Sequence, residues 1–161
     1  MLNPLRKPKQ LQLERTYPAP IERVWEAWTN PELLRQWWGP EKTSVTNCEV
    51  DLVVGGQLNI VIEAGSEMGK YAGTRWPMTG TFTLIEAPTR LTYDATSWTE
   101  GDQADSTIHH TNDITLRAVD DTTVVTFDVD ITAIGPKAKM AAFGMKWGYK
   151  SHLDALGELL T

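Results

Sequence analysis

The segment from Gly135 to Leu160 is the only long helical pattern in the sequence, and it constrains the fold more than any other feature. Pro136 suits the first turn of a helix, because the backbone N–H that proline lacks would have no helical partner there. Apolar residues then recur at steps of three and four, which makes one continuous stripe: Met145, Tyr149, Leu153, Leu156 and Leu160. A helix with such a stripe must pack against a large apolar surface, which the rest of the chain has to supply.

That surface is predicted to be a β-sheet. The segment from Thr43 to Ile131 alternates between apolar and polar residues and predicts six strands, and Gln10 to Tyr17 predicts one more. Helical spacing predicts a short helix over residues 20–28. A cap at Asn30 or Thr29, with Pro31 at the first position, predicts a second over residues 32–38. Successive strands joined by short turns favour antiparallel pairing, and the long helix must cover one face. The sequence therefore predicts an α+β fold with about seven antiparallel strands.

Composition limits the possible functions. The 161 residues suit one domain, which we assign to residues 10–161, after a disordered leader over residues 1–9. A net charge of −6 argues against nucleic-acid binding. The single cysteine, Cys48, excludes an intramolecular disulfide and is typical of a reducing compartment. No apolar run has the length of a membrane span or the place of a signal peptide, so we expect a cytoplasmic protein.

Alternation along the strands separates residues that face the long helix from residues that face water. The inward sets are Leu58, Ile60 and Ile62; Met78, Phe82 and Leu84; Leu91 and Tyr93; Ile108, His110, Asn112, Ile114 and Leu116; and Val125, Phe127, Val129 and Ile131. Their outward neighbours are mostly threonine and aspartate. The predicted interior is thus apolar, with polar groups only from Tyr93, His110 and Asn112.

Such an interior has two interpretations. An apolar hollow with a few polar groups is typical of a small-molecule pocket. The alternative is a filled core in which Tyr93, His110 and Asn112 bond to one another or to the backbone. A metal site is not indicated, because His109 and His110 are adjacent on a strand and point to opposite faces. No motif for a cofactor occurs, so none is expected.

Two aromatic features also leave alternatives open. The block Trp37-Trp38-Gly39-Pro40 is either a lid over the mouth of a pocket or a packing plug at one end of the sheet. Phe143 and Trp147 lie on a second side of the long helix, where they either pack against strands or form a homodimer contact.

The order of elements and several local motifs resemble one family in particular, over about residues 11–160. These motifs are Ala19-Pro20, the run Val24 to Glu32, the block Gln36 to Pro40, Asp51-Leu52 with Gly55-Gly56, Gly80, the turn Pro88 to Leu91, and Gly144, Gly148-Tyr149, Leu153 and Leu156 in the last helix. Together they resemble the activator of Hsp90 ATPase homologue 1-like (AHSA1-like) family of the START/Bet v 1-like (SRPBCC) superfamily. Tyr149 stands where that family usually has tryptophan. The resemblance implies a helix-grip fold, in which a curved antiparallel sheet grips the C-terminal helix around an apolar cavity.

Three functions follow as hypotheses. The first is non-catalytic binding of a small apolar or amphipathic molecule. The second, implied by the resemblance, is a co-chaperone-like interaction with Hsp90. The third is a cyclase- or dehydratase-like reaction on a polyketide or aromatic substrate, using His110 and Tyr93. The predicted pocket residues are Trp38, Ile60, Ile62, Met78, Phe82, Tyr93, His110, Asn112, Phe127, Met145, Tyr149 and Leu153.

Overall fold

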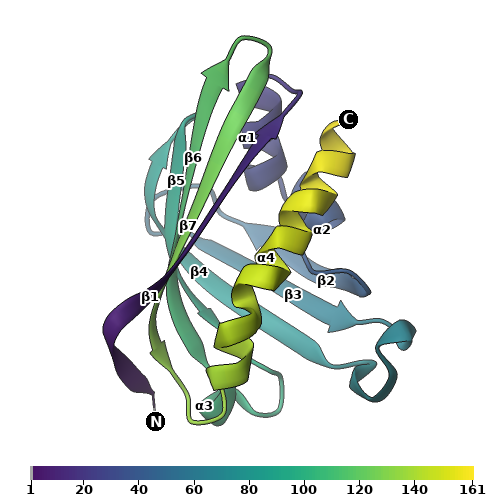
Figure 1. Ribbon diagram of the computed structural model, residues 1–161, viewed down its shortest axis with the longest axis vertical. Coiled ribbons are helices and arrows are strands. Elements are labelled where there is room, and N and C mark those ends of the chain that lie inside the picture. Colours follow the sequence, from purple (N-terminus) through teal and green to yellow (C-terminus); the bar gives the residue numbers. More distant parts are fainter. Residues whose placement is uncertain (1) are drawn as a thin grey trace.

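The computed structural model describes residues 2–161, with the backbone alone at residues 6–8. Within these residues one antiparallel sheet has the strand order β1-β7-β6-β5-β4-β3-β2. The strands are β1 (Asn3–Tyr17), β2 (Thr43–Val50), β3 (Gln57–Ala64), β4 (Arg75–Glu86), β5 (Arg90–Ser97), β6 (Ile108–Val119) and β7 (Thr122–Ile134). The sheet curves around helix α4 (Lys139–Leu160), which crosses its concave side (Figure 1). The predicted α+β helix-grip architecture is confirmed.

Two short helices follow β1, as predicted: α1 (Ile21–Thr29) and α2 (Pro31–Trp37). Asn30 caps α2, because its side-chain oxygen accepts a hydrogen bond of 2.9 Å from the backbone N–H of Glu32. Pro31 occupies the first turn of α2, where it costs no hydrogen bond. Two further short elements lie in loops, η1 (Ser66–Tyr71) and α3 (Gln103–Ser106).

Strand β1 begins earlier than predicted. Its backbone pairs with β7 from Asn3 opposite Ile134 and Pro4 opposite Ala133, and the register shifts between Pro4 and Lys9. Residues 3–9, which we expected to be a disordered leader, therefore form the first part of a strand. Apolar and polar residues do not alternate there, so the strand depends on backbone pairing with β7.

Helix α4 begins four residues later than predicted. Gly135 and Pro136 lie in the turn before it, where the Gly135 N–H donates a hydrogen bond of 2.7 Å to the carbonyl oxygen of Thr107. That bond ties the end of β7 to the start of β6. An added Cβ at Gly135 would overlap the backbone carbonyl of Asp105, so the close approach of two loops requires glycine there.

The alternation predicted for the strands holds except at a bulge. Every predicted inward residue is buried apart from Ile62, which is half-buried in the core, and Leu84. The pairing of β4 with β5 shifts between Phe82 and Leu84, and the shift reverses which side chains face inward beyond it. Ile85 packs on the core instead of Leu84.

A cluster of tryptophans closes the core under the short helices. The Trp28 ring lies edge-on to Trp37 at 4.7 Å between centroids, to Trp38 at 6.2 Å and to Phe127 at 5.3 Å. Trp37 is fully buried, and its indole N–H donates to the carbonyl oxygen of Ala27 at 2.8 Å. Of the two interpretations of the Trp37-Trp38 block, the packing plug applies to Trp37.

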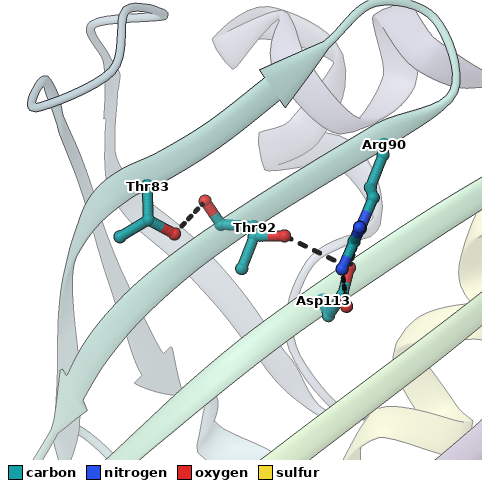
Figure 2. Close-up of polar contacts among 4 residues, drawn as sticks. All are labelled: Thr83, Arg90, Thr92 and Asp113. Carbon is teal, nitrogen blue, oxygen red and sulfur yellow. Dashed lines mark hydrogen bonds and ion pairs between the residues drawn. The ribbon is translucent and has the colours of Figure 1, made fainter.

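The outward face of the sheet carries a polar network (Figure 2). Arg90 donates two hydrogen bonds to the carboxylate of Asp113, from Nε at 3.1 Å and from Nη2 at 2.9 Å. The Thr92 hydroxyl donates to the same carboxylate at 3.2 Å, and the Thr83 hydroxyl donates to the carbonyl oxygen of Thr92 at 3.2 Å. Thr92 and Asp113 alternate with the buried Tyr93 and Asn112, so the network faces away from α4. An ion pair this exposed contributes little to stability.

Replacing Gly144 or Gly135 by alanine is expected to change the free energy of unfolding in opposite directions. Gly144 is exposed within α4, and a Cβ there would meet no atom within 4 Å. Gly144→Ala should therefore raise the free energy of unfolding by about 0.5–1 kcal/mol through helix propensity. Gly135→Ala should lower it by about 1–3 kcal/mol, because two backbones must separate. Urea unfolding measures both changes in the free energy of unfolding, and a change of the same sign in the two variants would contradict this packing.

Candidate functional site

A pocket of about 190 Å³ lies between the N-terminal half of α4 and the concave face of the sheet. Strands β3 to β6 form one wall, and α4 forms the other. Its lining residues are Trp38, Ile62, Trp76, Pro77, Met78, Ser97, Trp98, Thr99, Ser106, Ile108, Ala141, Met145, Gly148, Tyr149 and His152. Apolar side chains dominate this lining, and its polar side-chain groups are uncharged: hydroxyls, indole N–H groups and one imidazole.

Helix α4 presents two different faces. The pocket residues from α4 recur at helical spacing and lie on one side: Ala141, Met145, Gly148, Tyr149 and His152. Gly148 leaves this wall open, because a Cβ there would meet no atom within 4 Å. On the outer side Met140, Phe143 and Trp147 are 87%, 80% and 68% exposed. Phe143 and Trp147 are therefore not buried against strands of the same chain, although Nζ of Lys9 in β1 lies 4.8 Å from the centre of the Phe143 ring.

A chain of buried polar groups runs beside the pocket. The Ser97 hydroxyl lies 2.9 Å from Nε2 of His110, and Nδ1 of His110 lies 2.7 Å from Oδ1 of Asn112. The Asn112 amide nitrogen donates to the hydroxyl of Tyr93 at 3.1 Å and to that of Tyr149 at 3.5 Å. Ser97 and Tyr149, at the two ends of the chain, both line the pocket. The middle of the chain is buried beneath the pocket wall.

Burial determines the protonation of this chain. It lowers the pKa of His110 to about 4, so the ring is neutral at pH 7 and carries one proton. Because the Asn112 oxygen can only accept a hydrogen bond, that proton is on Nδ1 of His110. Nε2 then has a free lone pair, and the Ser97 hydroxyl must donate its proton to it. Burial also raises the pKa of Tyr149 to about 12, so its hydroxyl stays protonated.

The order Ser97, His110, Asn112 is that of a nucleophile, a general base and an orienting group. Two features of the structure oppose that role. A base with a pKa near 4 accepts a proton poorly at neutral pH. The next two residues in the sequence are Trp98 and Thr99. Their backbone N–H groups already donate to the carbonyl oxygen of Pro77 at 3.1 Å and to the hydroxyl of Ser106 at 2.8 Å, respectively. Neither is free to stabilise an oxyanion, so the arrangement suits binding better than nucleophilic catalysis.

His152 is a second buried imidazole in the pocket wall. Its ring packs edge-on to Trp38 at 4.6 Å and to Tyr149 at 5.2 Å. Burial lowers its pKa to about 3, so it too is neutral at pH 7. Within the described residues its Nδ1 has no hydrogen-bond partner. An unpaired buried polar atom beside a pocket is costly, and a ligand group could reduce that cost.

A sequence model of one protein family, described as activator of Hsp90 ATPase homolog 1-like protein, matches residues 18–161. This chain belongs to that family. The match covers α1, α2, strands β2 to β7 and α4, and thus the whole pocket. A comparison with curated proteins finds no match.

Solved structures of similar proteins share the fold of this AHSA1-like chain. One, from Nitrosomonas europaea, is 25% identical with a TM-score of 0.72, over 94% of this chain and 93% of its own. Another, an uncharacterized protein from Rhizobium leguminosarum, is 20% identical with a TM-score of 0.79, over 99% and 97%. A third, from Rhodobacter sphaeroides, is 23% identical with a TM-score of 0.72, over 99% and 97%.

Five of the predicted site residues line the pocket of this AHSA1-like protein: Trp38, Ile62, Met78, Met145 and Tyr149. The other seven lie in the core and do not line it: Ile60, Phe82, Tyr93, His110, Asn112, Phe127 and Leu153. The three predicted polar groups bond to one another, as the filled-core interpretation required, while an open pocket lies beside them. Contact of any of these residues with a ligand stays a prediction.

Sequence reasoning missed several residues of the pocket. His152 follows Met145 by seven residues and Tyr149 by three, so helical spacing alone places it on the same face. Ser97 has the inward parity of Tyr93 and Ala95, but neither Ala95 nor Ser97 is a large apolar residue, so the alternation of β5 is weak beyond Tyr93. Trp98 follows β5 in a loop and Ser106 ends the four-residue helix α3, and in segments this short no periodicity predicts a direction.

Neither a metal cluster nor an activated thiol occurs in the part of the chain that the structure describes. Among residues 2–161, no group of three or more histidine, cysteine, aspartate or glutamate side chains is arranged to hold a metal ion. Burial raises the pKa of the Cys48 thiol to about 11, which opposes a role as a nucleophile. In the same described range, no helix of this AHSA1-like protein combines the length and apolarity needed to cross a membrane.

Proposed function

We propose that this protein binds a small, largely apolar molecule in the pocket between α4 and the sheet, without catalysing a reaction on it. The observation that carries the proposal is the pocket itself, with about 190 Å³ of space and an apolar lining. A cavity of about 150 Å³ is enough to hold benzene, and drug-sized ligands need about 300–1,000 Å³. The expected ligand therefore has the size of one or two fused rings.

The chemistry of the lining supports the same conclusion. Its side chains include no aspartate, glutamate, lysine or arginine. A charged group buried there would lose its hydration without gaining a counter-charge, which is strongly unfavourable. An enzyme that used His110 and Tyr93 would need those groups in the pocket, and neither lines it.

Filling the pocket from α4 should abolish binding. Gly148→Leu places a side chain in the open space beside Met145, and it should improve helix propensity. Calorimetric titration with 2-naphthol should show binding to the wild type and at least about tenfold weaker binding to Gly148→Leu. Gly144→Ala, a matched change four residues earlier on α4, should leave the affinity unchanged. Equal affinity in all three proteins would contradict a ligand site in this pocket.

The second candidate is a co-chaperone-like interaction with Hsp90, and one specific observation favours it. Met140, Phe143 and Trp147 form an exposed apolar row on the outer side of α4. Stimulation of Hsp90 ATPase activity by the wild type, lost in Trp147→Ala and kept in Gly148→Leu, would support this function. A homodimer through the same row and a cytoplasmic location remain predictions.

A further inference from the structure

If the pocket binds a ligand as in the proposed function, on which this inference rests, the positions of the protons around Ser97 indicate which polar group that ligand carries. Ser97 is the last residue of β5 and shares the inward parity of Tyr93 and Ala95. Its side chain lines the pocket and at the same time touches His110. It is therefore one of the two residues, with Tyr149, through which the buried polar groups meet the pocket.

The hydrogen bonds beneath Ser97 leave its hydroxyl one role toward the pocket. Asn112 donates through its amide nitrogen to Tyr93, so its oxygen is the atom that faces His110 and accepts from Nδ1. Nε2 of His110 then accepts the proton of the Ser97 hydroxyl, at an oxygen–nitrogen distance of 2.9 Å. A hydroxyl has one proton and two lone pairs. With the proton used, Ser97 offers only lone pairs to the pocket.

We propose that Ser97 Oγ accepts a hydrogen bond from a hydroxyl or N–H group of the ligand, so that the pocket selects alcohols, phenols or amides over their O- or N-methylated analogues. A donor that fits gains a bond in an apolar setting, where hydrogen bonds are strong. An analogue with a methyl group in place of that hydrogen leaves the Ser97 oxygen facing an apolar surface. Sites built around a buried polar group discriminate in this way more sharply than apolar walls do.

Two probes and one variant test this selection. Calorimetric titrations of the full chain use 2-naphthol and 2-methoxynaphthalene, which share the ring system and differ in the donor. The wild type should bind 2-naphthol about tenfold more tightly than 2-methoxynaphthalene. In Ser97→Ala the ratio of the two affinities should fall close to one, mainly because 2-naphthol binds more weakly. The thermal midpoint of Ser97→Ala shows whether it is folded. If it is not, the wild-type ratio still decides whether the pocket selects donors, and Ser97→Cys, which nearly keeps the size of the side chain but replaces the hydroxyl oxygen by a weak acceptor, takes the place of the alanine variant.

The outcomes separate the selection from the proposed function. Equal binding of both probes to the wild type, or tighter binding of 2-methoxynaphthalene, would overturn the role of Ser97 and leave the pocket as a binding site. Binding of neither probe would overturn both proposals. A ratio that persists unchanged in a folded Ser97→Ala would show that another group accepts the hydrogen bond.

Discussion

Lowering the pH from about 7 to about 5 should cost this protein about 4 kcal/mol of its free energy of unfolding, because two buried histidines resist protonation. Burial lowers the pKa of His110 to about 4 and that of His152 to about 3, from a usual value of 6.5. In the unfolded chain both rings take up a proton as the pH falls below about 6.5, and in the folded chain they do not. Stability is therefore fully present above about pH 6.5 and falls as the pH drops below it.

The magnitude follows from the linkage between proton binding and unfolding. Each histidine contributes about 1.4 kcal/mol per pH unit below its unfolded pKa, or about 2 kcal/mol at pH 5. This loss is large beside the total of about 5–15 kcal/mol for a typical domain. Urea unfolding at several pH values measures it. His152→Leu should reduce the dependence on pH by about half, and an unchanged slope in that variant would contradict the neutral, buried state of His152.

Trp28→Ala should destabilise the fold by about 3–5 kcal/mol, because Trp28 joins the rings of Trp37 and Trp38 at the end of α2 to that of Phe127 in β7. The side chain is 3% exposed, and its removal leaves a cavity between Trp37, Trp38 and Phe127. Urea unfolding measures the loss as a lower midpoint with the slope unchanged.

Trp28→Phe is the matched control for that cavity. Within the described residues the indole nitrogen of Trp28 is buried without a hydrogen-bond partner. Phenylalanine keeps an aromatic ring and removes that unpaired donor, so its cost should be clearly smaller than that of alanine. Equal losses in the two variants would show that the aromatic contacts of Trp28 contribute little.

The main elements could be predicted because their periodicity is local. The spacing of Met145, Tyr149 and Leu153 predicts one face of α4 without any knowledge of its partner. Alternation along β6 and β7 predicts the buried side chains there for the same reason. The cap at Asn30 and the proline after it likewise depend on neighbours in the sequence.

The rest depends on contacts between distant segments. The bulge between Phe82 and Leu84 reverses an alternation that looks regular in the sequence. The first residues of β1 become a strand only through pairing with β7. The pocket is displaced from the predicted polar cluster because Asn112 pairs with both tyrosines and fills that space. The volumes of many side chains together decide which part of an apolar interior stays open. Local sequence patterns therefore do not predict the position of the pocket.

The location of a bound ligand tests the central claim most directly. A crystal of the protein grown with 6-bromo-2-naphthol, which keeps the hydroxyl donor, shows the bromine by its anomalous scattering, independently of any model of the ligand. The account predicts a bromine peak between α4 and the sheet, in the pocket bordered by Ser97, Met145 and Gly148. A peak only on the outer side of α4, beside Trp147, or a pocket that stays empty at saturating ligand, would contradict it.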